Sequence, residues 1–177
     1  MKIKVKNKII FETFHHYVLE TDLDSFEFKD NELLCERISK DNIDQVGSAV
    51  GNTTRKWVMS EYPYAEGYCF RNEDGDIVGS CWMMLKGGDE KLYKVRKCDV
   101  FMFRLEVLES FRGKKYSKKI MNNIYRMAKD KGCKKVRFVT ATKNAIAIHL
   151  HESLGAKIIG ERFFVRVFNR NIPYYSV

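Results

Sequence analysis

Short runs in which hydrophobic and polar residues alternate make up most of this chain, and a period of two is typical of β-strands. Strands are therefore expected over 2–11, 14–19, 33–38, 67–70, 77–85, 92–108, 135–141, 156–160 and 163–168. The first two can form one strand or a hairpin. The turn Asn72–Gly75 predicts a hairpin between its neighbours, and a turn at Gly160–Glu161 is expected to join the last two strands. The long strand over 92–108 is expected to bend near 97–99.

Four segments are predicted to be helical, most of them from hydrophobic residues three or four positions apart. They cover residues 43–50, 55–60, 116–131 and 144–154. Asn42 is a helix start signal before the first, and Pro63 lies beyond the end of the second. Gly132 and Gly155 stand where the last two helices should stop.

The stretch from Leu105 to Ser117 combines a strand, a tight turn and the beginning of a helix. The first N–H groups of a helix have no partner within the helix, and the helix dipole favours an anion beside them. Basic side chains surround this point: Arg112, Lys114, Lys115, Lys118 and Lys119. The sequence therefore predicts a phosphate-binding site here.

The composition agrees with an anionic ligand. The formal net charge is +9 and the pI is about 9.3, which suits a phosphorylated cofactor, nucleic acid or an anionic surface. The five cysteines are scattered without a C-x-x-C pair, so neither a metal site nor a disulfide framework is predicted. The N-terminal apolar run is too short for a signal peptide and no stretch is long enough to span a bilayer, so a cytoplasmic location is expected.

Two motifs resemble the GNAT superfamily of N-acyltransferases. Residues 107–117 are similar to its acyl-CoA loop, [RQ]-x-x-G-x-[GA], and residues 144–156 are similar to its N-x-x-A motif that ends in glycine. The resemblance covers about residues 33–168 and implies an α/β (α+β) fold: a mixed, mostly antiparallel central sheet with helices on both faces. Residues 1–32 are then an N-terminal extension packed on the same domain, and residues 33–177 form the acyltransferase domain.

In this family the loop amides bind the diphosphate of acetyl-CoA, and the strand edge before the loop pairs with the pantetheine. The resemblance implies these residues for binding coenzyme A: Leu105, Val107, Arg112, Gly113, Lys114, Lys115, Tyr116, Ser117 and Asn144. Val107 would also polarise the thioester carbonyl through its N–H group. Lys115 stands where the family has glycine, and Ser117 where it has glycine or alanine. The Lys115 side chain can crowd the loop, or its ammonium group can replace lost amide contacts.

The resemblance also implies an acid for the leaving thiolate and a base for the amine. His151 falls where the family usually has a tyrosine acid. A histidine of ordinary pKa, about 6.5, can protonate a thiolate near neutral pH. Glu106, beside the proposed carbonyl donor, is the first candidate for the base, and Asp99 and Glu109 lie further off. Without such roles, His151 is a half-exposed helix residue and Glu106 is a surface carboxylate.

The function implied is that of an acetyl-CoA-dependent N-acetyltransferase in which a primary amine attacks the thioester directly. The acceptor stays open between small-molecule and peptide amines. The alternative is a non-catalytic GNAT-like module that binds an anionic ligand or a partner. Nucleic acid is not expected, because the positive charge is spread along the chain without a helix-turn-helix pattern. No membrane partner is expected, and a second copy of the chain is a candidate partner.

Five aromatic residues can line the acceptor cleft or belong to the core: Trp57, Tyr62, Tyr64, Tyr68 and Trp82.

Overall fold

The computed structural model of this protein describes residues 2–5, 8–30, 33–50, 65–85, 89–90, 93–95, 97–167 and 170–174. The chain divides into two compact units: the first contains Met1–Glu20 and Phe138–Val177, and the second contains Thr21–Arg137. The helix expected over 55–60, with Trp57, Tyr62 and Tyr64, lies outside the described residues. In the part of the chain that is described, no helix is long and apolar enough to cross a membrane.

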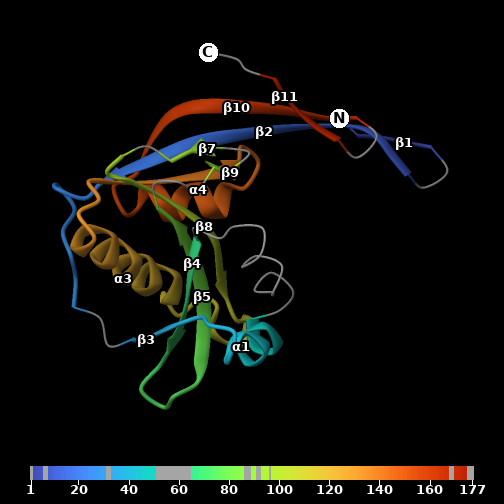
Figure 1. Ribbon diagram of the computed structural model, residues 1–177. Helices are drawn as coiled ribbons and strands as arrows, with labels where there is room; N and C mark the ends of the chain where they lie inside the picture. The colour runs from blue at the N-terminus through green and yellow to red at the C-terminus, as the bar shows by residue number, and fades with distance from the viewer. Residues whose placement is uncertain are drawn as a thin grey trace. The chain divides into compact units, whose positions relative to one another are not determined.

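The second unit is built on a sheet with the strand order β9-β8-β5-β4-β3. The strands are β3 (Leu34–Arg37), β4 (Ala65–Arg71), β5 (Ile77–Met84), β8 (Asp99–Val107) and β9 (Lys135–Ala141), the last of which ends in the first unit. All neighbours are antiparallel except β8 and β9. Helices α1 (Ile43–Val50) and α3 (Tyr116–Asp130) lie on opposite sides of β4 and β5 (Figure 1). The expected mixed, mostly antiparallel sheet with helices on both faces is confirmed.

The two faces of β5 are both buried, which explains its continuous apolar sequence. On one face Trp82, 1% exposed, packs in a cluster with Ile43 and Val46 of α1. The strand opposite leaves room for the indole at Gly67, where a Cβ atom would lie 2.7 Å from the ring. Tyr68 and Trp82 therefore belong to the core.

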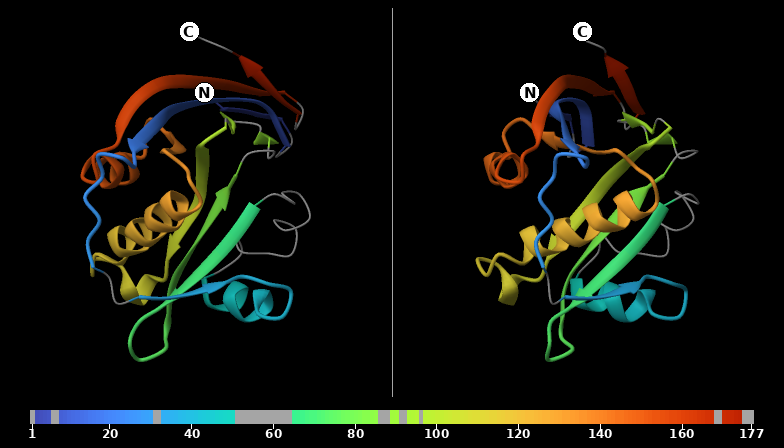
Figure 2. Two further views of the ribbon diagram at one scale, coloured as in Figure 1. Left: turned by 60° about the vertical axis from the view of Figure 1, so that its left-hand side comes forward. Right: turned by 90° about the vertical axis from the view of Figure 1, so that its left-hand side faces the viewer.

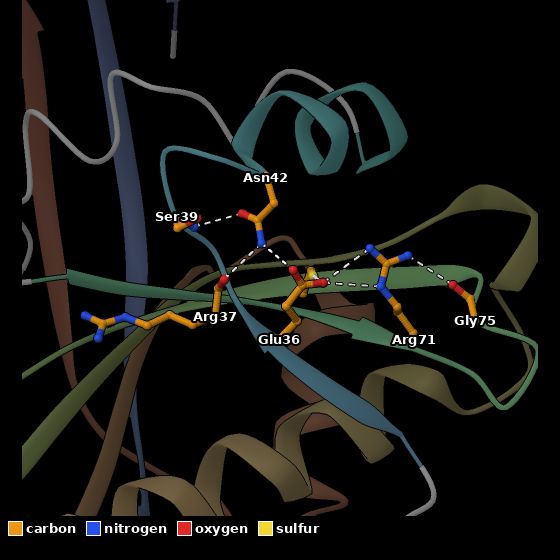
Figure 3. Close-up of polar contacts among 7 residues, drawn as sticks. Glu36, Arg37, Ser39, Asn42, Arg71 and Gly75 are labelled. Carbon is orange, nitrogen blue, oxygen red and sulfur yellow. Dashed lines mark hydrogen bonds and ion pairs between the residues drawn. The ribbon is translucent and has the colours of Figure 1, made fainter.

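Side chains around Asn42 fix the start of α1 to the edge of the sheet (Figure 3). The Asn42 amide accepts a hydrogen bond from the Ser39 N–H (2.8 Å) and donates to Glu36 (2.7 Å). The other oxygen of Glu36 accepts from Arg71 at 3.3 Å. The hydrogen bond from Asn42, helped by Arg71, lowers the pKa of the Glu36 carboxyl. This network joins β3, α1 and the β4–β5 turn.

The first unit contains a hairpin of β1 (Lys2–Val5) and β2 (Lys8–Asp22). A hairpin is one of the expected alternatives, but β1 ends within the expected strand over 2–11, and β2 runs through the segment 14–19 without a break. The long strand β10 (Lys157–Val167) runs antiparallel to β2, and β11 (Arg170–Tyr174) adds to its other side (Figure 2). Helix α4 (Ala145–Glu152) completes the unit.

The turn expected at Gly160–Glu161 is wrong, and β11 was not foreseen. Residues 157–167 form one strand whose register with β2 shifts between Ile158 and Gly160. The continuous strand β2 supplies partners on both sides of this irregularity, so the glycine marks a bulge rather than a chain reversal.

The single long strand expected over 92–108 is also divided. A short strand, β7 (Tyr93–Lys94), pairs with β6 (Asp89–Glu90), and β8 begins only at Asp99. Cys98 just before it has a left-handed backbone (φ 66°), and its carbonyl accepts a hydrogen bond from the Lys134 N–H. The bend expected near 97–99 is therefore a turn that separates two strands.

Substitution of Gly79 by alanine should destabilise the second unit. A Cβ atom there would collide with the Glu106 carbonyl oxygen and would lie 2.8 Å from Cδ1 of Ile120 on α3. Overpacking of this kind costs about 1–3 kcal/mol. Gly160→Ala is the matched control, because nothing lies within 4 Å of its added Cβ atom. Urea unfolding should separate the two variants, and equal midpoints would contradict the crowding at Gly79.

Candidate functional site

The strand β8 carries a bulge near its carboxyl end. Its register with β5 pairs Phe103 with Trp82 and Glu106 with Ser80, so β8 has one residue more than its partner between these pairs. Arg104 takes up the extra residue with a left-handed backbone (φ 51°). A bulge of this type bends a strand and changes the direction of the residues after it, here Leu105 to Val107.

The parallel pairing between β8 and β9 stops early. The register joins Asp99 to Lys135 and ends with Phe101 opposite Arg137, although β8 continues to Val107. Arg137 also binds Asp99 in a buried ion pair of 2.9 Å, with side chains 8% and 7% exposed. The ion pair therefore joins the two ends of this short register, Asp99 in its first pair and Arg137 in its last. Beyond Phe101 the pairing ends: in the described part of the chain, residues 102–107 of β8 are not paired with β9.

The loop after β8 is a short 3-10 helix, η1 (Glu109–Phe111), followed by a tight turn. Arg112 closes this turn, since its N–H bonds the Glu109 carbonyl (3.2 Å) and its Nε donates to the Val107 carbonyl (3.3 Å). Gly113 and Lys115 both have left-handed backbones, with φ of 76° and 63°. The Arg112 side chain thus ties the loop to the strand that precedes it.

Helix α3 begins without a side-chain cap, because Lys115 is its N-cap residue and offers no acceptor. Within the described residues, the Lys115 carbonyl accepts from the N–H groups of Lys118 and Lys119. The N–H groups of the residues before Lys118 have no acceptor within the helix, as at the start of every helix. Lys114 lies 5.3 Å from the Phe111 ring and is exposed, as is Lys115. The expected anion site therefore consists of main-chain donors with cations around them.

Lys115→Gly should stabilise the protein by about 0.5–1 kcal/mol. A side chain in the left-handed region costs about 1–2 kcal/mol, and the larger entropy of unfolded glycine removes part of the gain. Lys115→Ala is the control, since it removes the same charge and keeps the Cβ atom. Thermal unfolding of both variants tests this. A Lys115→Ala variant as stable as Lys115→Gly would contradict the strain at this residue.

Glu106 is half-buried beside the bulge, rather than a fully exposed surface carboxylate. Burial raises the pKa of its carboxyl, and the charge of Arg104 opposes this in part. In the described part of the chain its buried Oε2 atom has no hydrogen-bond partner. Of the two other carboxylates considered, Asp99 is held by Arg137 and Glu109 is exposed. Glu106 is therefore the carboxylate of the three best suited to accept a proton.

Asn144 and His151 lie in the first unit, on α4. The Asn144 side chain caps the helix, accepting a hydrogen bond from the Ala147 N–H (3.2 Å). His151 is only 7% exposed and stacks on Phe138, with ring centroids 3.7 Å apart. Burial lowers the pKa of His151 to about 4, so at pH 7 it is a neutral imidazole. The sequence could not reveal this burial, because it depends on the strand that packs against α4.

The structure thus brings Leu105, Glu106, Val107 and residues 112–117 together in one unit. Sequence reasoning missed Arg104 and Gly79. Arg104 adopts a conformation that favours glycine without being one, so no sequence signal marks the bulge. Gly79 lies within the strand expected over 77–85, and nothing in that pattern marks it as the position that admits the Glu106 carbonyl.

A family model described as the acetyltransferase (GNAT) family matches residues 30–156. This chain belongs to the GNAT acetyltransferase family. The match includes both motifs and the bulged strand that precedes them. The expected resemblance is confirmed. No curated protein matches the chain.

Solved structures of low sequence identity share the GNAT fold. A protein of unknown function from Staphylococcus epidermidis is 15% identical with a TM-score of 0.63, over 88% of this chain and 62% of that one. A GNAT-family protein from Novosphingobium aromaticivorans is 12% identical with a TM-score of 0.62, over 87% and 63%. AAC(6′)-Iy, bound to a bisubstrate analogue of coenzyme A and acetylneamine, is 16% identical with a TM-score of 0.54, over 70% and 89%. This chain spans less than two thirds of the length of the Staphylococcus epidermidis and Novosphingobium aromaticivorans proteins.

Proposed function

We propose that this protein transfers an acetyl group from acetyl-CoA to a primary amine. Two observations next to each other carry the proposal. The part of β8 after Phe101 is not paired with β9, and the helix that follows, α3, has no side-chain cap at its N-terminus. An extended pantetheine can add to such an edge through its amide groups, as an extra strand does. The diphosphate then reaches the start of α3, where main-chain N–H groups and the helix dipole favour an anion.

The loop residues have distinct roles in this proposal. The amides of Gly113 to Ser117 bind the diphosphate, and the exposed side chains of Arg112, Lys114 and Lys115 screen its charge. The edge at Leu105 and Val107 holds the pantetheine, with the Val107 N–H directed at the thioester carbonyl.

Glu106 accepts the proton that the acceptor ammonium must lose before attack. The amine lone pair then forms the C–N bond, the C–S bond breaks, and the thiolate leaves with the bonding electrons. The second proton lost by nitrogen ends on sulfur. The family resemblance implies His151 as the acid for the thiolate; because burial lowers its pKa to about 4, it is neutral at pH 7 and can offer its ring N–H as a hydrogen-bond donor but carries no acidic proton at that pH.

The low pKa of His151 has a consequence for stability. The unfolded chain binds a proton at this group near pH 6.5, and the folded chain binds it only near pH 4. Stability is therefore fully present above pH 6.5 and falls as the pH drops to 4, by about 3 kcal/mol at most. Urea unfolding of wild type and His151→Leu across this range measures the difference. An unchanged pH slope in the variant would show that His151 is not the cause.

His151→Ala should lower turnover more than it lowers affinity for acetyl-CoA, because the thiolate forms only during the reaction. Equal turnover would exclude a role for the imidazole in departure of the thiol.

Thermal shift with acetyl-CoA, followed by release of free thiol over a panel of amines, tests the function. We expect stabilisation by acetyl-CoA and thiol release with at least one amine. Stabilisation without turnover would favour the alternative, a GNAT-like module that only binds an anionic ligand. The absence of any shift with acetyl-CoA and longer acyl-CoA esters would overturn the proposal.

A further inference from the structure

The bulge in β8 places two chemically different side chains on one face of the sheet. Phe103 is paired with Trp82 of β5, and Glu106 is paired with Ser80. Residues directly opposite each other share a face, and Ser80 and Trp82, two positions apart, lie on the same face of β5. Phe103 and Glu106 therefore share this face as well. In a regular strand, residues three positions apart face opposite sides, so the extra residue at Arg104 is what brings the ring and the carboxylate together.

This face is the one that α1 covers in part, and α3 lies on the opposite side (Figure 1). Trp82 belongs to the buried cluster beneath α1, and four hydrophobic residues packed against this cluster are only partly buried. They are Val50, Ala65, Phe103 and Leu108. The ring centroid of Phe103 lies 6.5 Å from that of Trp82 and 5.9 Å from that of Phe101. The carboxylate of Glu106 thus shares its face with a partly exposed apolar surface.

Glu106 differs from the carboxylates of the neighbouring strands β3 and β4. Glu36 on β3 is bound by Arg71 (Figure 3), and Glu66 on β4 is bound by Lys131 at 3.0 Å. The buried Oε2 atom of Glu106 has no hydrogen-bond partner in the part of the chain that is described. One ammonium group can therefore find its counter-ion at Glu106, whereas the second ammonium group of a polyamine would meet carboxylates on β3 and β4 that already hold a cation.

We propose that the acceptor is an amine with a single ammonium group and an aromatic ring two or three carbons away. This inference rests on the proposed function and specifies the class of acceptor. The ammonium group lies at Glu106, which takes its proton, and the ring packs on Phe103. Their partners on β5 are two positions apart, roughly 7 Å along a strand, a separation that such a carbon link suits. Packing ring on ring removes apolar surface from water on both molecules, so Phe103 determines specificity.

Thiol release from acetyl-CoA with three amines, 2-phenylethylamine, ethanolamine and spermidine, tests the proposal. We expect kcat/KM for 2-phenylethylamine to exceed that for each of the others at least tenfold, as burial of one aromatic ring implies. A value for ethanolamine or spermidine within threefold of it, or above it, would overturn the inference about the acceptor and leave the proposed function intact. No thiol release with any of the three or with a wider panel of amines would overturn both.

Phe103→Ala and Phe28→Ala form a matched pair of variants. Both remove a partly buried ring, but Phe28 precedes β3 and lies 5.7 Å from Arg126 and from Lys129, on the α3 side of the sheet. The measured quantity is the ratio of kcat/KM for 2-phenylethylamine to that for ethanolamine, which does not depend on the fraction of folded protein. This ratio should fall about tenfold in Phe103→Ala and stay within twofold of wild type in Phe28→Ala.

Phe103→Leu keeps an apolar side chain at this position and should restore part of the ratio. An unchanged ratio in Phe103→Ala, or an equal fall in Phe103→Ala and Phe28→Ala, would overturn the assignment of Phe103.

Discussion

Arg137→Met should lower the free energy of unfolding by about 3–5 kcal/mol. The variant leaves the Asp99 carboxylate, 7% exposed, without the guanidinium that neutralises it at 2.9 Å. An unpaired buried charge is among the most destabilising consequences of a single substitution. Urea unfolding followed by circular dichroism measures the loss, and the melting temperature should fall by about 10 °C.

The double variant Asp99→Leu/Arg137→Met provides the control. A buried ion pair replaced by apolar residues of similar size is often no less stable, because neither charge must then leave water. We expect the double variant to recover most of the loss. A double variant with the summed loss of the two single variants would instead show that the two side chains act independently. A single variant as stable as wild type would contradict the importance of the pair.

Glu106→Gln should lower kcat about 10³-fold and change the KM for acetyl-CoA little. Glutamine keeps the shape of the side chain and cannot accept a proton, and general base catalysis typically contributes 10²–10⁴-fold. Because burial raises the pKa of this carboxyl, wild-type activity should fall at a higher pH than an ordinary glutamate would cause. Below that pKa the carboxyl is protonated and inactive, so the variant should lack this decline. Thiol release as a function of pH measures both effects.

Glu109→Gln is the control for this prediction. Glu109 lies on η1, three residues further along, and its side chain is exposed. The variant should keep wild-type activity and the same pH profile. A Glu106→Gln variant with more than a third of wild-type turnover would contradict the assignment, and a larger loss in Glu109→Gln would move the base to η1.

Much of the fold could be predicted because local signals specified it. The period of apolar residues gave α3 from Tyr116, and the strand β9 has the predicted limits, Lys135–Ala141. Gly132 and Gly155 end helices with left-handed backbones, as their positions after the last apolar residues indicated. Such signals act within a few residues, so they do not need the rest of the chain.

Other features depended on contacts between distant segments. The strand β10 continues through Gly160 because β2 pairs with it on both sides of the bulge, and β2 precedes it by more than a hundred residues. The extra residue at Arg104 follows from the register between β5 and β8, which no short stretch encodes. A turn and a bulge use the same residue types, and only the presence of a partner strand distinguishes them.

The sequence by itself determined the basic loop that leads into α3, the spacing of the two motifs and hence membership of the GNAT family. It also indicated an unusual lysine at position 115. Only the tertiary structure decided that Lys115 has a left-handed backbone, that the register between β8 and β9 ends at Phe101, and that His151 is buried and neutral. The reason is that residue types report local preference and chemistry, whereas strand register, burial and the resulting pKa arise from neighbours that are far apart in the chain.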